Sequence, residues 1–199
     1  NKRYLPHIKL SPNITVSNDI VEVAADKELL VVASPSLYLA DTIKKNTSVP
    51  NIADGSTIIL ALTKGFVPSV DGPKLILETI ENVLPGIYKG NTVYVSGPSH
   101  AEEVAMGKLT GLIAASENPK QSIRVREMLK VPSLMVYASF DVVGVQICAA
   151  AKNVIAVVYG ALDAVAEHSE VFGDDAASLL LAAGLNEIQT LGMAMGATH

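Results

Sequence analysis

The chain has 199 residues, of which 49% are hydrophobic and 18% charged, as in an ordinary globular protein long enough for one or two domains. Its net charge of -5 provides no basic stripe to meet phosphate backbones, which argues against nucleic acid as the main partner. The one cysteine, Cys148, cannot form an intrachain disulfide. It fits a reducing compartment, and we expect its sulfur to pack as a small hydrophobic group.

Five short apolar runs, rich in β-branched residues, predict strands that are covered on both faces. Helix-like segments lie between these runs, and strands that alternate with helices predict a mostly parallel sheet with crossover helices. The predicted strands are residues 29–33, 57–62, 92–96, 111–115 and 134–138, and the predicted helices are residues 37–45, 75–84, 101–106 and 122–129.

The pattern changes after residue 139, where two helical segments follow without a further strand. They cover about residues 140–168 and 174–195, with Gly173 as the turn residue and Asp174 as the expected N-cap of the second. The fold class is therefore α/β, with a sheet domain over residues 1–139 followed by the start of an all-helical domain over residues 140–199.

The most apolar stretch, residues 142–165, raises the question of a membrane span. Polar residues interrupt it, and its longest apolar piece is far shorter than the ~20 residues that a span needs. We interpret it as a core helix and expect no membrane span. The first residues show no signal-peptide pattern, and the absence of an initial Met suggests a processed or partial chain.

Small and polar residues follow three of the predicted strands. Ser34-Pro35-Ser36 follow the first strand, Thr63-Lys64-Gly65 the second, and Gly97-Pro98-Ser99 the third. Carboxyl ends of parallel strands meet at one edge of a sheet, where ligands bind, so we expect these loops to lie together. Small turn residues are also what any such loop needs.

The loops after the second and third strands each allow a structural and a functional interpretation. Ser99 and Glu102 form a capping-box pattern that simply starts a helix, and this reading is favoured on pattern alone. In the alternative, Gly97 lets the backbone approach a ligand while Ser99 and free N–H groups bind polar oxygens. Lys64 is either a solvated loop residue, which is slightly favoured, or a cation that holds a phosphate or hydroxyl group.

Lys152 lies in the apolar stretch AAAKNVIAVV, with small or apolar residues at helical spacings of three, four and seven. No acid lies within one turn, so an intrahelical ion pair is excluded. Lys152 either reaches the surface or a distant acid, or it is a desolvated amine with a lowered pKa that transfers a proton. Asn153 could bind the same ligand. The pattern favours neither reading.

No other constellation in the sequence points to chemistry. The four histidines show no metal-ligand spacing and Cys148 has no partner, so we expect no metal site. The sequence has no hydrolase nucleophile motif, and it has neither a Gly-rich dinucleotide loop nor a Walker motif.

Taken in order, the motifs resemble those of the bacterial-type NAD(P)-dependent glycerol-3-phosphate dehydrogenase family. They are RYLP, VVASPS, LTKGF, SGPSHAEEVA, GVQIC, AAAKNVIAVVYG and GLNEIQTLGMAMGA, and SGPSHAEEVA and KNVIA are the most specific. The resemblance implies a Rossmann-like dinucleotide domain, here partial, before a helical substrate domain. It also implies a cytoplasmic homodimer that interconverts glycerol 3-phosphate and dihydroxyacetone phosphate with NAD or NADP, for phospholipid synthesis.

The same resemblance implies roles for individual residues. Lys152 acts as the acid or base at the C2 oxygen, and Lys64, the second catalytic residue, contacts both substrate and cofactor. Gly97, Ser99 and Asn153 line the substrate site with the two lysines. The cofactor-binding set is Pro35, Ser36, Lys64 and Ala101.

The chain also departs from the family pattern. The family's Gly-rich loop and its C-terminal GLGD and S-R-N segments are missing, so we expect an internal segment that by itself binds NADH poorly. A related hydroxyacid dehydrogenase with another substrate and a non-catalytic homologue both stay open as alternatives, and the choice between NAD and NADP is not encoded here. The departures within the matched region are Gln146 for Glu, Ala149 to Ala151 for Gly-Ala-Leu, Asp175 and Ala177 for an Asn and a Lys, and Ala183 for Arg.

Overall fold

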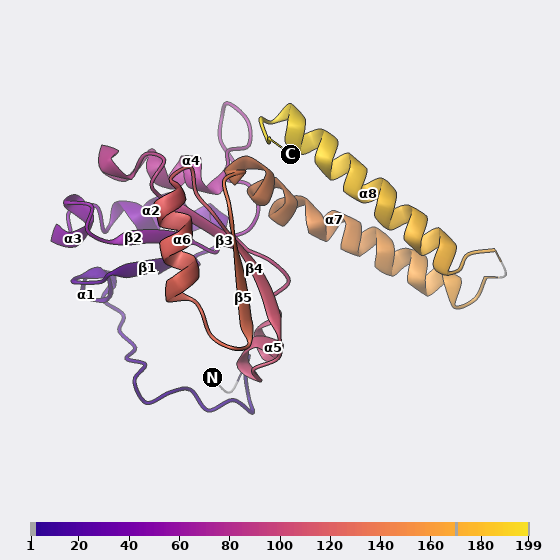
Figure 1. Ribbon diagram of the computed structural model, residues 1–199, viewed down its shortest axis with the longest axis horizontal. Helices are drawn as coiled ribbons and strands as arrows, with labels where there is room; N and C mark the ends of the chain where they lie inside the picture. Colours follow the sequence, from indigo (N-terminus) through magenta and orange to yellow (C-terminus); the bar gives the residue numbers. More distant parts are fainter. Residues whose placement is uncertain (1–2, 170, 199) are drawn as a thin grey trace.

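A five-stranded sheet carries a long helical hairpin at one end (Figure 1). The structure is a computed structural model that describes residues 3–169 and 171–198, so Asn1 and His199 lie outside the described residues. The strands follow one another across the sheet in chain order. They are β1 (Leu29–Val32), β2 (Ile58–Ala61), β3 (Val93–Ser96), β4 (Thr110–Ala115) and β5 (Leu134–Ser139).

All five predicted strands are present, and the α/β prediction is confirmed. Three of the four strand pairings are parallel, but β4 runs antiparallel to β3. The connection between them contains only α5 (Ala101–Ala105), which has no buried residue. A five-residue helix that buries no side chain does not cover a sheet face, and the chain turns back here instead of crossing over.

The remaining helices match the predicted segments, apart from two short ones that lack a clear pattern. The two unpredicted helices are α1 (Ile20–Ala24) and α3 (Pro50–Ala53). The others are α2 (Leu39–Lys44) after the short 3-10 helix η1 (Ser36–Tyr38), α4 (Ile76–Glu81) before η2 (Gly86–Tyr88), α6 (Pro119–Met128), α7 (Val142–Ala166) and α8 (Asp174–Ala194).

Helix starts depend on caps that were only partly predictable. The carboxylate of Asp141 accepts a hydrogen bond of 2.9 Å from the Gly144 N–H and starts α7. The prediction that Asp174 caps α8 is wrong, because Gly173 occupies the cap and Asp174 is the first helical residue. An acidic residue in that first turn is still favourable beside the positive end of the helix dipole.

The core consists of two apolar clusters, one on each face of the sheet. Alternate residues of β2 belong to different clusters: Ile59 packs with α2 and α4, whereas Leu60 packs with α6. Every residue of β2 and β3 is buried. Burying each large apolar side chain contributes about 1.5–3 kcal/mol, so these two strands are the most stabilised part of the sheet.

Only the first turns of α7 join this core. Its last buried residue is Ala149, and beyond it Val154 and Val157 are 67% and 73% exposed. The core-helix prediction is therefore right for the start of α7 and wrong for the rest, and Cys148 is exposed. Among the described helices, α7 alone is long and apolar enough to cross a membrane, and 28% of its most apolar stretch is buried. One helix of this length and composition is weak evidence for a membrane span.

The outer part of α7 packs against α8, which doubles back along it (Figure 1). Gly184 of α8 lies so close to α7 that a Cβ there would be 2.7 Å from the Cδ1 of Ile155. The two helices of the hairpin thus pack closely on each other outside the core of the sheet.

Candidate active site

The loops that follow β1, β2 and β3 meet at one edge of the sheet, as predicted. These three strands are parallel and in register, which places their carboxyl ends side by side. The buried Thr63 hydroxyl donates a hydrogen bond of 2.7 Å to the Ser34 carbonyl and joins the first two loops. The hydroxyl oxygen of Ser34 is itself buried without a hydrogen-bond partner among the described residues.

Lys64 lies in the loop after β2 at this edge, and its amine is close to the amine of Lys152. Partial burial lowers the pKa of Lys64, and the positive charge of the neighbouring Lys152 lowers it further. In the described part of the chain, neither amine has a carboxylate within 4.0 Å. Two neighbouring cations without an acid attract an anion or an oxygen on which negative charge develops.

Lys152 reaches this position from α7, just beyond the buried start of the helix. Both Lys152 and Asn153 are exposed, so of the two interpretations of residue 152 the structure agrees with a lysine that reaches the surface rather than a desolvated amine. The lysine can reach water because α7 has already left the core at Ala149. What singles out Lys152 is therefore its approach to Lys64 rather than burial.

The Gly97 loop is shaped by the sheet. Gly97 has φ +154°, and a Cβ there would lie 2.4 Å from the Gly111 carbonyl oxygen on β4. Glycine is needed because two backbones approach each other closely, in contrast to the expected approach to a ligand.

The capping box predicted for Ser99 and Glu102 does not form. His100 occupies the cap of α5, and the Ser99 hydroxyl turns back to donate a hydrogen bond of 3.3 Å to the Gly97 carbonyl. The Glu102 carboxylate lies 3.2 Å from the His100 ring instead. Ser99 is half-buried at the strand edge, and Ala101 is exposed at the start of α5.

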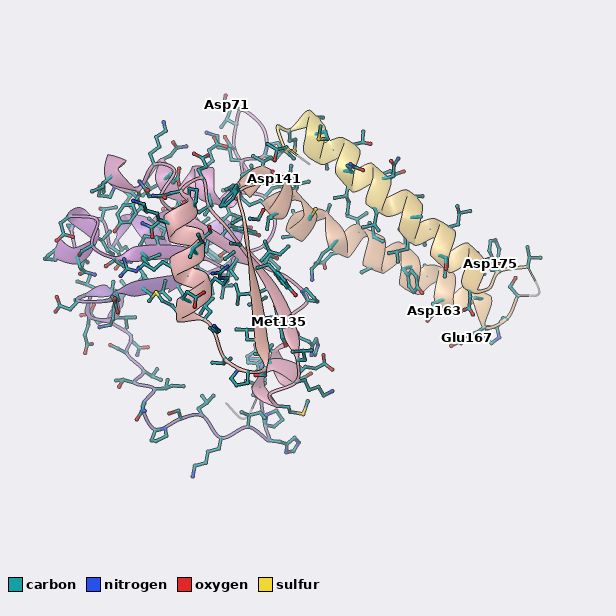
Figure 2. All side chains as sticks on the ribbon, viewed as in Figure 1. Asp71, Met135, Asp141, Asp163, Glu167 and Asp175 are labelled. Carbon is teal, nitrogen blue, oxygen red and sulfur yellow. The ribbon has the colours of Figure 1, made fainter. Side chains whose placement is uncertain are left out.

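The remaining predicted residues divide between the strand edge and the hairpin. Pro35 and Ser36 lie directly after β1, where Pro35 caps η1. Asp175 lies with Asp163 and Glu167 at the end of the hairpin remote from Asp141 (Figure 2). The departures at Asp175 and at neighbouring Ala177 therefore lie far from the paired lysines.

Two structural features of the site were missed from the sequence. Thr63 joins two loops, and Gln146 is buried between helices that are distant in the chain. The sequence marked Gln146 as an amide within the apolar start of α7 and as a departure from the family's Glu, but neither signal identified its partner, the Leu77 N–H.

Other regions of the described chain offer no comparable site. No group of three His, Cys, Asp or Glu residues among the described positions could hold a metal ion. A cavity of about 410 Å³ lies beside the start of β3, at the opposite end of that strand from the paired lysines, and Thr92, Leu77 and Gln146 are among the residues that line it.

A mostly parallel sheet whose strands end beside paired lysines, followed by a helical unit, places the chain in the Rossmann-type class of folds. Family models sharpen this assignment: that of the NAD-dependent glycerol-3-phosphate dehydrogenase N-terminus matches residues 1–122, and that of the C-terminus matches residues 141–199. The chain belongs to the NAD-dependent glycerol-3-phosphate dehydrogenase family.

Individual relatives agree with this assignment. The chain is 54% identical over 205 residues to glycerol-3-phosphate dehydrogenase [NAD(P)+] of Treponema denticola, and 34% identical over 196 residues to that of Bacillus subtilis. These alignments cover 100% and 98% of this chain but 57% and 54% of the relatives, so the chain spans little more than half their length. The crystal structure of glycerol-3-phosphate dehydrogenase from Coxiella burnetii matches with a TM-score of 0.84 and 26% identity, over 100% of this chain and 57% of that one.

Proposed function

We propose that the protein containing this chain interconverts glycerol 3-phosphate and dihydroxyacetone phosphate with NAD or NADP, and so supplies glycerol 3-phosphate for phospholipid synthesis. The observation that carries the proposal is the approach of Lys152 to Lys64 without a neighbouring acid, at the carboxyl edge of the sheet. Parallel sheets bind ligands at this edge, and a phosphorylated substrate brings the negative charge that two amines attract.

Each predicted site residue has a role in this proposal. Lys152 gives or takes the proton at the C2 oxygen, while the positive charge of Lys64 stabilises negative charge that develops there. Asn153 follows Lys152 and is exposed, so its amide is free to bind a substrate hydroxyl. Gly97 and Ser99 line the substrate side of the edge.

The cofactor side of the edge would be formed by Pro35, Ser36, Lys64 and Ala101. The buried, unpartnered hydroxyl of Ser34 fits this assignment, because a polar group of a bound dinucleotide would satisfy it. When bound, the nicotinamide would supply the hydride chemistry at C2. The residues of this chain position the substrate and handle its proton.

The same proposal covers the organisation and location of the protein. Residues 1–139 would form the dinucleotide domain and residues 140–199 the start of the substrate domain, which agrees with the start of α7 at Val142. We propose a cytoplasmic homodimer with no membrane span. Lys152 and Asp163 support the last point, because each charge would cost about 2.5–3.5 kcal/mol near the centre of a membrane helix.

The decisive test is Lys152→Ala in the complete gene product. We expect kcat for glycerol 3-phosphate oxidation to fall on the order of 100-fold or more, because a proton-transfer group is lost. The unfolding midpoint should change little, because Lys152 is exposed.

Lys120→Ala is the matched control, since Lys120 is also an exposed helical lysine but lies on α6. Near-wild-type turnover by Lys152→Ala would contradict the proposal. Turnover of 2-hydroxy or 3-hydroxy acids instead of glycerol 3-phosphate would identify a related dehydrogenase, and absence of any turnover by the wild type would identify a non-catalytic homologue.

A further inference from the structure

Gln146 is the polar residue at the buried start of α7. It is 2% exposed, and both ends of its amide are hydrogen-bonded. The Oε1 atom accepts a hydrogen bond of 2.9 Å from the Leu77 N–H, and Nε2 donates one of 3.1 Å to the Val142 carbonyl. The first bond joins residues 69 positions apart, on α7 and α4.

The partner on α4 explains why an amide suits this position. Leu77 lies in the first turn of α4, where backbone N–H groups have no acceptor within the helix. The cap residue of α4 is Leu75, which provides no side-chain hydrogen bond. Gln146 therefore supplies a cap from another part of the chain, and its second bond keeps the amide from rotating.

The hydrogen bond between Gln146 and the Leu77 N–H attaches α7 to the sheet domain, and it depends on the orientation of the two groups. Among the described residues, it is the one hydrogen bond between a side chain of α7 itself and another element of the sheet domain. At the cap of α7, the Asp141 N–H also donates a hydrogen bond of 3.2 Å to the Ser139 hydroxyl at the end of β5. Asp141 bonds to Gly144 within the start of α7, and the buried Ile147 makes apolar contacts that do not depend on direction. The hydrogen bond of Gln146 thus restrains the start of α7 relative to α4, alongside the apolar contacts of Ile147 and the bond at the cap.

Lys152 lies six residues beyond this attachment, on the part of α7 that has left the core. At 1.5 Å per residue, the distance along the helix is about 9 Å, so a tilt of about 6° at Gln146 would move residue 152 by about 1 Å. A displacement of about 1 Å in a reacting group can cost on the order of 100-fold in rate.

We propose that Gln146 is a positioning residue that, through its hydrogen bond to the Leu77 N–H, sets the angle of α7 and so holds Lys152 against Lys64. The catalytic consequence of this inference rests on the proposed dehydrogenase function. The geometric consequence, the approach of the two amines, does not.

The kinetic test compares two substitutions in the complete gene product. Gln146→Met keeps the length of the side chain but removes the acceptor, and kcat should fall about 10-fold or more while the KM for NADH stays within about twofold. Gln146→Glu keeps the acceptor for the Leu77 N–H at the start of α4, where a negative charge is favourable, but loses the bond to the Val142 carbonyl, and it should recover part of kcat.

Ser122→Ala provides the control for a purely structural effect. Ser122 is fully buried on α6, and its hydroxyl donates a hydrogen bond of 3.0 Å to the Pro119 carbonyl, remote from α7. This variant should lower the unfolding midpoint and leave kcat unchanged. If Gln146→Met also left kcat unchanged in an active enzyme, or if Gln146→Glu were as slow as Gln146→Met, the proposal would be overturned.

A second readout does not require activity. The pKa of Lys64 is measured from the pH dependence of its labelling by an amine reagent, followed by mass spectrometry, in the wild type, Gln146→Met and Lys152→Met. Movement of α7 should raise the pKa of Lys64 in Gln146→Met towards its value in Lys152→Met. An unchanged pKa in Gln146→Met would refute the positioning role. A raised pKa in a protein without dehydrogenase activity would support that role and refute the proposed function.

Discussion

Lys64 and Lys152 form an arrangement that a protein without a ligand would avoid. Two amines interact at a strand edge, and no described carboxylate pairs with either. Like charges at short range cost free energy, and an anion that binds between them returns part of that cost. At the residue scale, the site is therefore prepared for a negatively charged ligand.

This arrangement predicts that loss of one charge stabilises the protein without ligand. Lys152→Met should slightly raise the free energy of unfolding at pH 7, because protonated Lys64 no longer faces a positive charge. The folded-state pKa of Lys64 is lowered, so the cost of its protonation is fully present below that pKa. This cost disappears as the pH rises past the ordinary value of 10.5.

Chemical denaturation at several pH values measures this effect, with Lys120→Met as the control. The gain from Lys152→Met should shrink towards zero above pH 10.5, and inorganic phosphate should stabilise the wild type more than the variant. A variant less stable than the wild type at pH 7 would show that Lys152 makes favourable contacts instead.

The pattern of residues alone did not decide the role of either lysine, because the pattern around each residue reports only its own element. Solvation was slightly favoured for Lys64, which is exposed, and Lys152 had two equal interpretations. Only the family resemblance implied that both lysines belong to one site. The contact depends on the angle between α7 and the sheet, which a local pattern does not encode.

At the scale of elements, the pairing of β3 with β4 depends on Gly97. Gly97→Ala should destabilise the protein by about 2–4 kcal/mol, because the Cβ adds backbone strain and a clash with β4. The added Cβ would lie 2.4 Å from the Gly111 carbonyl oxygen. This oxygen belongs to the backbone of β4, so it cannot move away as the end of a flexible side chain could.

Gly107→Ala is the matched control for this substitution. Gly107 also has a positive φ, +73°, but an added Cβ there would meet nothing within 4 Å. Gly107→Ala should lower the free energy of unfolding by about 1 kcal/mol, which is the cost of the backbone strain alone. Thermal unfolding of both variants would distinguish the two costs, and equal losses would show that the approach to β4 is not limiting.

The whole molecule consists of a well-buried sheet and a hairpin that has little contact with it beyond the first turns of α7. The hairpin leaves large apolar side chains such as Val154, Val157 and Leu179 exposed. Stability should therefore be uneven along the chain.

Hydrogen exchange measured by mass spectrometry on the 199-residue chain should reveal this difference. Amides of β2 and β3 should exchange most slowly, because every side chain in these strands is buried. Amides of α7 beyond Lys152 and of α8 should exchange faster by an order of magnitude or more. Equal protection of the hairpin and the sheet would mean that the chain unfolds as a single unit.

The sequence by itself determined the five strands of this protein and most of its helices. Apolar runs located all five strands, and small or polar residues marked the edge where the loops meet. Both signals are local, because the spacing of buried residues and the residue types in a turn are set by neighbours along the chain. The family motifs then singled out Lys64 and Lys152 as chemically important.

Only the tertiary structure decided how these elements meet. It reversed β4, left Lys152 exposed, brought it to Lys64, and connected Gln146 to Leu77. Each outcome depends on contacts between residues far apart in the chain, whose geometry is set by the packing of whole elements. Local patterns report which face of an element is buried, but not the partner or the angle at which the two elements meet.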